Sequence, residues 1–345
     1  MPRTSSSNDS SLGARLRRRS ITVPAVLLGF LLFSTLLLPA LVVGGLIDIT
    51  GRRRWSTVRV AVYAVWWAGL ESVGVLVAGL LWVIYAPVGK LRHQVSLKAH
   101  SGLQRWWSTN LVRGARVLLG MEYYIEDNRA FEREGPFIVL ARHGSQGDAL
   151  LVAAILASSR VRPRFVVKRQ LLWDPCLDLV GHRIPNYFVD RDSANNQKEL
   201  ENIGLLAADL EADEALVIFP EGTRFSAAKR DRAIEVLSRT APEREASASR
   251  LRHVLPIRTA GLLSVLGAAP ATDLVFLNHV GVADFRNVGD LWRNVPFPVP
   301  LRFSATHVSR AEVPSGRSSD ALVGWLDARW EDFDSWVEAN SVTVV

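Results

Sequence analysis

The segment FIVLARHGSQGD, residues 137–148, contains the pattern that decides the fold of this 345-residue chain. Its first four residues are apolar and predict a buried strand over 137–140, and the apolar residues after Asp148 predict a helix over 148–158. The two glycines between them allow a tight turn. Because functional side chains gather at the carboxyl ends of strands in an α/β sheet, His143 is expected at such an end. The segment therefore predicts a strand–turn–helix unit that carries a histidine and a carboxylate.

The same alternation continues through the rest of the chain. Further strands are expected at 164–168, 186–189, 215–219, 254–257, 273–277 and 301–305, and further helices at 193–210, 227–239 and 319–340. Continuous apolar strands that alternate with helices are typical of a sheet buried on both faces. We therefore expect an α/β fold with a mixed, mainly parallel sheet flanked by helices.

Two long apolar stretches precede this region. Residues 21–47 carry no charged side chain, and residues 60–88 carry only Glu71, which is expected to face its partner helix, water or a shallow position. Both stretches exceed the roughly 20 residues that cross a hydrocarbon core, and the first exceeds a signal-peptide core of about 7–15 residues. The expected division is a disordered basic tail at 1–20, an uncleaved membrane-embedded helical hairpin at 21–100 and one domain at 101–345.

The positive charge is concentrated near these stretches. Residues 1–100 hold 12 lysines and arginines against 3 acidic residues, whereas residues 101–345 hold 29 against 31. A nucleic-acid-binding protein carries its positive patch on its folded domain, so this distribution predicts anionic membrane lipids and no nucleic acid as partners. Arg52, Arg53 and Arg54 lie between the two stretches, which favours a hairpin that dips in from the cytoplasmic side and leaves full crossing open.

His143 and Asp148 have the chemistry of a general base and its orienting carboxylate. A carboxylate that accepts from Nδ1–H fixes the tautomer of the ring and leaves Nε2 to accept a proton. The alternative is an exposed loop histidine beside a helix-capping aspartate. Ser145 is not in a G-x-S-x-G elbow, which argues against a serine hydrolase. Cys176 is the single cysteine, which excludes a zinc site built on several thiolates, and we expect it in the core.

A second motif, Phe219-Pro220-Glu221-Gly222-Thr223-Arg224, ends the most apolar predicted strand. Gly222 allows a close backbone approach, Thr223 offers a hydroxyl, and Arg224 can bind a phosphate through two N–H groups. A surface turn with a solvated arginine is the alternative. The remaining histidines lack metal-ligand spacing, and the sequence has neither a P-loop nor a G-x-G-x-x-G motif, so no metal and no cofactor are expected.

In this order, the motifs resemble those of the glycerolipid acyltransferases typified by lysophosphatidic acid acyltransferase, over about residues 137–260. The four blocks are the HxxxxD segment from His143 to Asp148; Lys168, Leu171 and Pro175 followed by Val189-Asp190-Arg191; the intact segment 219–224; and a strand with an internal proline at 254–257. The third block has the lowest probability of arising by chance.

The resemblance implies direct transfer of an acyl chain from acyl-CoA or acyl carrier protein, without a metal or a covalent enzyme intermediate. It implies His143 and Asp148 as catalytic residues in an acyltransferase domain at 101–345. The implied substrate-binding residues are Lys168, Arg191, Glu221, Gly222, Thr223 and Arg224. Lys168 and Arg224 would hold the acceptor phosphate, and Glu221 would order the turn. Arg191 is equally well explained by a salt bridge with a neighbouring aspartate.

The implied acceptor is the lysophospholipid 1-acylglycerol 3-phosphate, which would make the reaction a step of phospholipid biosynthesis at a membrane. The alternatives are another acceptor, such as glycerol 3-phosphate, a different lysophospholipid or a glycolipid, and a non-catalytic membrane scaffold of the same fold. The chain departs from the family pattern at Arg142, where many members have asparagine, and in the Gly-Ser-Gln-Gly interior of the loop at 144–147. We therefore expect acceptor identity to depend on these residues.

Overall fold

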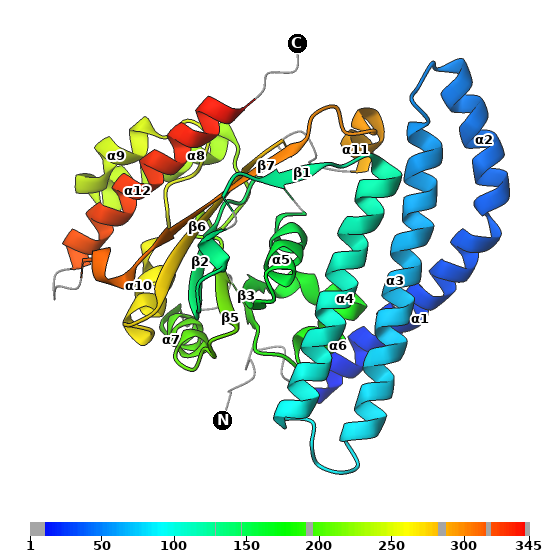
Figure 1. Ribbon diagram of the computed structural model, residues 1–345, viewed down its shortest axis with the longest axis horizontal. Coiled ribbons are helices and arrows are strands. Elements are labelled where there is room, and N and C mark those ends of the chain that lie inside the picture. The colour runs from blue at the N-terminus through cyan, green and yellow to red at the C-terminus, as the bar shows by residue number, and fades with distance from the viewer. Residues whose placement is uncertain are drawn as a thin grey trace. The chain divides into compact units, whose positions relative to one another are not determined.

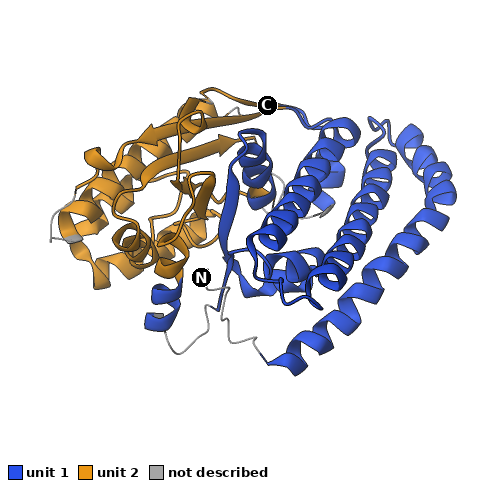
Figure 2. Cartoon of the chain, turned by 60° about the horizontal axis from the view of Figure 1, so that its bottom comes forward, with its two compact units in different colours: residues 1–122, 149–202, 287–299 blue, residues 123–148, 203–286, 300–345 orange. Residues whose placement is uncertain are grey.

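The structure is a computed structural model that describes residues 11–127, 129–145, 147–190, 196–281, 288–314 and 319–341 (Figure 1). The chain divides into two compact units (Figure 2). Unit 1 comprises residues 1–122, 149–202 and 287–299, and unit 2 comprises residues 123–148, 203–286 and 300–345. Each unit therefore combines segments that lie far apart in the sequence.

Unit 2 contains the strands of the central sheet that carry the first and second motifs. They are β1 (Tyr123–Ile125), β2 (Phe137–Ala141), β5 (Glu214–Ile218), β6 (Asp273–Val280) and β7 (Leu301–Val308), in the spatial order β1-β7-β6-β2-β5. β2 is parallel to β5 and β6, β1 is parallel to β7, and β6 and β7 are antiparallel. Every residue of β2 and β5 is buried, as expected for strands covered on both faces. The predicted α/β fold with a mixed, mainly parallel sheet is confirmed.

The helices of unit 2 follow the predicted pattern closely. They are η2 (Arg129–Phe131), α8 (Ala227–Thr240), η4 (Pro242–Arg244), α9 (Glu245–Arg250), α10 (Thr259–Ala268), η5 (Arg310–Glu312) and α12 (Ser319–Asn340). α12 has the predicted bounds. α5 (Asp148–Ser158) also has its predicted bounds and continues into the residues of unit 1, and α7 (Asn196–Ala207) is shorter than predicted. The sequence prediction did not include α9 and α10.

The strand predicted at 254–257 is wrong. Its backbone is irregular, and side chains replace the partner strand. The N–H of Val254 donates to Oδ1 of Asp334 at 2.9 Å, and the N–H of Leu255 donates to Oε2 of Glu221 at 2.9 Å. Pro256 has no N–H to contribute to a ladder. An apolar run can therefore be buried and extended without belonging to the sheet.

Unit 1 combines the N-terminal helices with a small parallel strand pair. Its elements are α1 (Leu12–Thr35), α2 (Leu37–Thr50), α3 (Ser56–Tyr85), α4 (Gln94–Leu119), β3 (Arg162–Lys168), η3 (Arg169–Trp173), α6 (Pro175–Gly181), β4 (Tyr187–Val189) and α11 (Val288–Asn294). β3 and β4 are parallel and correspond to two predicted strands. Because β3, β4 and α6 group with the N-terminal helices, the compact units do not follow the boundary expected near residue 100.

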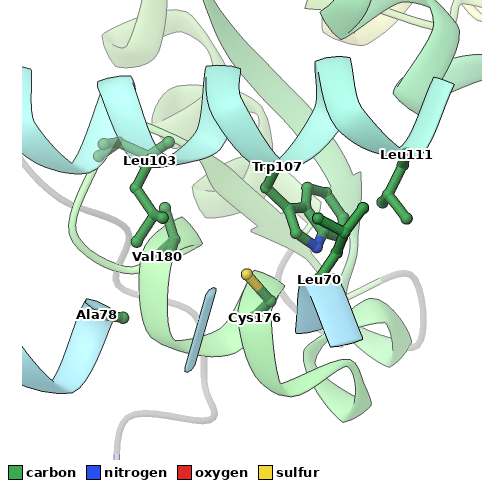
Figure 3. Packing of buried hydrophobic residues seen from close by; sticks show 8 residues of the cluster. Leu70, Ala78, Leu103, Trp107, Leu111, Cys176 and Val180 are labelled. Atoms are coloured by element: carbon green, nitrogen blue, oxygen red, sulfur yellow. The ribbon is translucent and has the colours of Figure 1, made fainter. Parts of the chain in front are cut away.

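The core of unit 1 is formed where α3, α4 and α6 meet (Figure 3). The cluster contains Leu70, Ala78, Leu103, Trp107, Leu111, Cys176, Val180 and Ile184. Cys176 is buried, as expected, and burial raises the pKa of its thiol. Glu71 is also buried and faces α4 rather than the other arm of the predicted hairpin, since its Oε1 accepts from Nε1–H of Trp107 at 3.0 Å. A Cβ at Gly74 would lie 2.6 Å from Sγ of Cys176, so this glycine allows α3 and α6 to approach closely.

Residues 12–20, expected in a disordered tail, form the first turns of α1. Ser11 caps this helix, because its Oγ accepts from the N–H of Ala14 at 3.2 Å. Arg18 and Arg19 donate to the buried carboxylate of Asp178, at 2.9 Å and 3.0 Å for the shortest bonds. The expectation was wrong because the partner of these arginines lies 160 positions away in the sequence.

By length and composition, α3 is apolar enough to cross a membrane, and α1 and α2 pass the same test as a pair that is bent by 61°. The break lies at Leu36, three residues before Pro39. A proline ring clashes with the carbonyl four residues earlier, and that residue is Thr35, where α1 ends. The first apolar stretch is therefore a broken helix rather than a straight one.

Candidate active site

The backbone of His143 is fixed where β2 ends. Its N–H donates to Oε1 of Glu221 at 2.7 Å, and its carbonyl accepts from the N–H of Phe225 at 3.1 Å. These two bonds tie the histidine to both sides of the turn at 219–225. The two motifs that are far apart in the sequence therefore lie together, held by these hydrogen bonds.

The side chains of His143 and Asp148 form the predicted pair. Nδ1 of His143 lies 3.1 Å from Oδ2 of Asp148, at the first residue of α5. The carboxylate is fully buried, whereas the imidazole is 21% exposed. The ring of His143 packs on Phe219, with 5.1 Å between centroids. A carboxylate only accepts, so Nδ1 carries the hydrogen and Nε2 carries the lone pair.

Asp148 is held ionised by the loop around it. Its Oδ2 accepts from the N–H of Ser145 at 2.8 Å, and its Oδ1 accepts from the hydroxyl of Ser145. Burial alone would raise the pKa of Asp148, but His279 and the hydrogen bonds from His143 and Ser145 lower it below its usual value. Ser145 therefore supports the carboxylate, in line with the sequence argument against a serine nucleophile.

A second histidine, His279, contacts the same carboxylate, and the sequence reasoning did not single it out. Its Nε2 lies 3.4 Å from Oδ1 of Asp148 and 3.3 Å from the carbonyl oxygen of Arg142. Burial lowers the pKa of His279 to about 4, so the ring is neutral at pH 7. The sequence feature that indicates His279 is its position just after the predicted strand 273–277, because this places it at the same carboxyl edge of the sheet as His143.

Arg142 holds the end of β2 to neighbouring backbone segments. It is buried, and its guanidinium donates to the carbonyl oxygens of His279 at 2.5 Å and His253 at 3.0 Å. The side chain thus ties the end of β2 to β6 and to the segment before 254. The guanidinium is engaged by backbone inside the unit, and the dependence of the acceptor on this position stays a prediction.

Glu221 connects three segments from within the core. Its two carboxylate oxygens accept from the N–H groups of His143 and Leu255, at 2.7 Å and 2.9 Å. Burial raises the pKa of Glu221 to about 7, although these two bonds and the nearby Arg142 act in the opposite direction. Glu221 is only 1% exposed and bonds to backbone on both sides, which fits the expected role of ordering the turn, and a part in substrate binding stays a prediction.

The turn after β5 requires a glycine at position 222. Gly222 has a φ of +71°, and a Cβ there would lie 2.9 Å from the Cδ of Arg258. The N–H of Gly222 donates to the carbonyl of Phe219 at 2.9 Å, and the N–H of Arg258 donates to the carbonyl of Pro220 at 2.8 Å. Gly222 therefore shapes the turn through its backbone.

Thr223 and Arg224 lie on the part of this turn that reaches His143. Arg224 is half-buried and directly precedes Phe225, whose N–H bonds to the carbonyl of His143. Nζ of the exposed Lys229 donates to Oγ1 of Thr223 at 3.1 Å and to the carbonyl of Arg224 at 3.0 Å. Lys229 adds a cation beside the predicted anion clamp that motif reasoning did not include.

The other predicted site residues lie elsewhere in the chain. Lys168 is the last residue of β3 in unit 1, and its role in binding stays a prediction. Arg191 lies outside the described residues. Among the described residues, no group of three or more histidine, cysteine, aspartate or glutamate side chains is arranged to hold a metal ion.

The sequence model of the Acyltransferase family matches residues 122–260. No curated protein matches the sequence. A solved structure, the 1-acyl-sn-glycerophosphate (LPA) acyltransferase PlsC from Thermotoga maritima, aligns at 15% identity with a TM-score of 0.48, over 79% of this chain and 100% of that one. The matched region includes both motifs, so residues 122–260 are similar to the Acyltransferase family, which supports an acyltransferase activity.

Proposed function

We propose that the protein is a membrane-bound O-acyltransferase that transfers an acyl chain from acyl-CoA or acyl carrier protein to the hydroxyl of 1-acylglycerol 3-phosphate. The observation that carries the proposal is the hydrogen bond between Nδ1 of His143 and Oδ2 of Asp148, at 3.1 Å, beside the Glu221–Arg224 turn. The buried carboxylate orients the ring, and the partly exposed ring presents Nε2.

His143 acts as a general base in the proposed reaction. Nε2 takes the proton of the acceptor hydroxyl while the hydroxyl oxygen forms a bond to the thioester carbonyl carbon. The carbon–sulfur bond then breaks, and the proton on Nε2 passes to the leaving thiolate. Asp148 stabilises the imidazolium that exists between these two proton transfers, through the bond to Nδ1–H. Charge balance is maintained without a covalent acyl-enzyme.

Arg224 is proposed to hold the acceptor phosphate. A guanidinium binds a phosphate through two parallel N–H bonds, and Arg224 immediately precedes the residue that pairs with the carbonyl of His143. Lys229, which lies over the same turn, adds a second positive charge. Lys168 and Arg191 stay in the proposal as further phosphate ligands on the strength of the sequence resemblance.

The proposed membrane attachment uses the N-terminal helices. Their large exposed apolar residues include Leu28, Leu31, Leu32, Leu36, Leu38, Val42, Val43, Leu46, Leu76, Leu80, Val83 and Ile84. Exposed apolar surface of this extent is unusual on a water-soluble protein. The exposed Trp66, Trp67 and Trp82 are of the type that lies at lipid–water interfaces. We propose that these helices embed in the membrane and that unit 2 faces the cytoplasm.

Replacement of His143 tests the proposed reaction. We expect His143→Ala to lower the rate of phosphatidate formation about 10²- to 10⁴-fold, the usual contribution of a general base. The purified full-length enzyme would be assayed with lysophosphatidate and labelled acyl-CoA or acyl carrier protein, and the product identified by mass. The matched control is His307→Ala, because His307 also contacts an aspartate, Asp273 at 2.9 Å, near the opposite end of β6.

Two outcomes would count against the proposal. Unchanged product formation by His143→Ala would exclude the assigned base, and equal losses in both variants would indicate a folding defect. The wild-type enzyme would also be offered glycerol 3-phosphate, lysophospholipids with larger head groups and a glycolipid. Preferential acylation of one of these compounds would support the proposed acyl transfer and assign a different acceptor to it.

A further inference from the structure

A basic pocket in unit 1 is lined by residues that are distant in the sequence from His143 and Asp148. None of these residues has a role in the reaction described above. The pocket has a volume of about 120 Å³ and is lined by Arg15, Arg19, Leu91, Arg92, His182 and Arg183. These residues come from the start of α1, the connection between α3 and α4, and the two positions that follow α6. None of the described residues that line it is acidic.

The carboxylate of Asp178, which contacts two residues of the pocket wall, already accepts from several donors. The oxygens of Asp178 accept from Arg18 at 2.9 Å and from Arg19 at 3.0 Å, and Oδ1 lies 3.1 Å from Nδ1 of His182. Burial opposes ionisation of Asp178, but the bonds from His182, Arg19 and Arg18 hold its pKa below the usual range. One carboxylate therefore faces several guanidinium groups, and positive charge is in excess.

The excess is concentrated on the pocket walls. Within the described part of the chain, neither Arg92 nor Arg183 forms an ion pair with a carboxylate. Burial lowers the pKa of Arg183, and the charges of Arg19, Arg15 and Arg92 lower it further. Guanidinium groups that repel one another in a half-buried site are stabilised by an anion that binds between them.

His182 provides an independent indication of a ligand. Its side chain is 7% exposed, stacks on Phe188 with 5.1 Å between centroids, and bonds through Nδ1 to the carbonyl oxygen of Asp178 at 2.9 Å. Its Nε2 is buried and has no hydrogen-bond partner among the described residues, although the ring lines the pocket. A buried polar nitrogen without a partner is costly, and a ligand bound in the pocket would supply that partner.

We propose that this pocket binds a phosphate group, and that its source is the head group of an anionic phospholipid. Planar guanidinium groups and an imidazole around a small cavity match the oxygens of a phosphate. The lipid source is favoured because Leu12 and Leu16, on the same turns of α1 as Arg15 and Arg19, are exposed and apolar. The lipid assignment rests on the membrane association proposed above, whereas phosphate binding does not.

The test uses full-length protein and two separate probes. Inorganic phosphate is added to the detergent-solubilised protein. In separate samples, the protein is inserted into phosphatidylcholine nanodiscs that contain phosphatidic acid. Each probe should raise the melting temperature of the wild type, since a ligand that binds the folded state stabilises it. In the double variant Arg92→Gln/Arg183→Gln we expect apparent affinity for both probes to fall about tenfold or more.

The matched control is Arg17→Gln, an exposed arginine of α1 that does not line the pocket. It should respond to both probes as the wild type does. Without any anion, the double variant should melt no lower than the wild type, because the substitutions remove repulsion, and this keeps the test independent of folding defects. His182→Gln should weaken binding of both probes without altering the response of the control.

The outcomes separate the two parts of the proposal. A response to inorganic phosphate alone would keep the phosphate site and exclude the lipid as its source. Equal responses of the wild type and the double variant, or equal losses in the double variant and Arg17→Gln, would overturn the site. Since these readouts are melting temperatures, they hold even if acyl transfer to lysophosphatidate is not observed.

Discussion

At the scale of single residues, the proposed active site depends on how one carboxylate is shared. Asp148 contacts His143 through Oδ2 and His279 through Oδ1, and Ser145 bonds to both oxygens. His279 is fully enclosed and neutral, so it offers an N–H without adding a charge. The proposed base is thus the histidine that is partly exposed, and the enclosed histidine helps to fix the position of the carboxylate.

The enclosed histidine predicts acid sensitivity. The pKa of His279 is about 4 in the folded chain and about 6.5 in an unfolded one, so between these values the unfolded state binds a proton that the folded state does not. The free energy of unfolding should therefore fall as pH drops from 6.5 to 4, by about 3 kcal/mol from this residue. His279→Gln should remove that part of the dependence, measured as melting temperatures at pH 7 and pH 5, whereas His307→Gln should not. Equal slopes in the wild type and His279→Gln would contradict the assignment.

At the scale of elements, the turn after β5 is the part of the site most sensitive to backbone change. Gly222 has a left-handed conformation and faces Arg258. We expect Gly222→Ala to cost about 1–2 kcal/mol of stability and to lower kcat/KM about 10- to 100-fold, because Arg224 and the carbonyl of His143 are positioned by this turn. Melting temperature and steady-state kinetics measure the two effects.

Another glycine provides the control for this substitution. Gly267 lies in α10, and a Cβ at this position would have no atom within 4 Å. Gly267→Ala should therefore leave activity unchanged and raise stability by up to about 1 kcal/mol, because alanine favours a helix more than glycine does. Normal kinetics for Gly222→Ala would show that the turn tolerates movement and would remove it from the proposed site.

At the scale of the whole molecule, the N-terminal helices are part of a core and not a detachable anchor. Trp107 of α4 donates to Glu71 of α3, and Cys176 of α6 packs against Gly74. We expect a chain of residues 94–345 to lack a cooperative melting transition in detergent-free buffer, because loss of α3 exposes this cluster to water. A chain of residues 11–345, purified in detergent, should melt cooperatively. A soluble, cooperatively melting 94–345 chain would support the boundary that the sequence predicted.

Local patterns were sufficient to predict many of the elements. The apolar run of β2, the bounds of α5 and α12, and the two motifs follow from residues that are close in the sequence. The spacing of His143 and Asp148 brings them together because only a short turn separates a strand from a helix. β1 was not predicted, since three residues are too few to show a period.

The fold class, the two motifs and the apolar helices are all encoded in local sequence. The roles of His279, Arg142 and Glu221 arise from the tertiary structure, because each depends on contacts between distant segments. Arg142 and His279 are 137 positions apart and meet because β2 and β6 are parallel neighbours in register. Arg18 and Asp178 are 160 positions apart and meet because α1 packs against α6. Periodicity encodes which face of an element is buried, but it does not encode which element covers it.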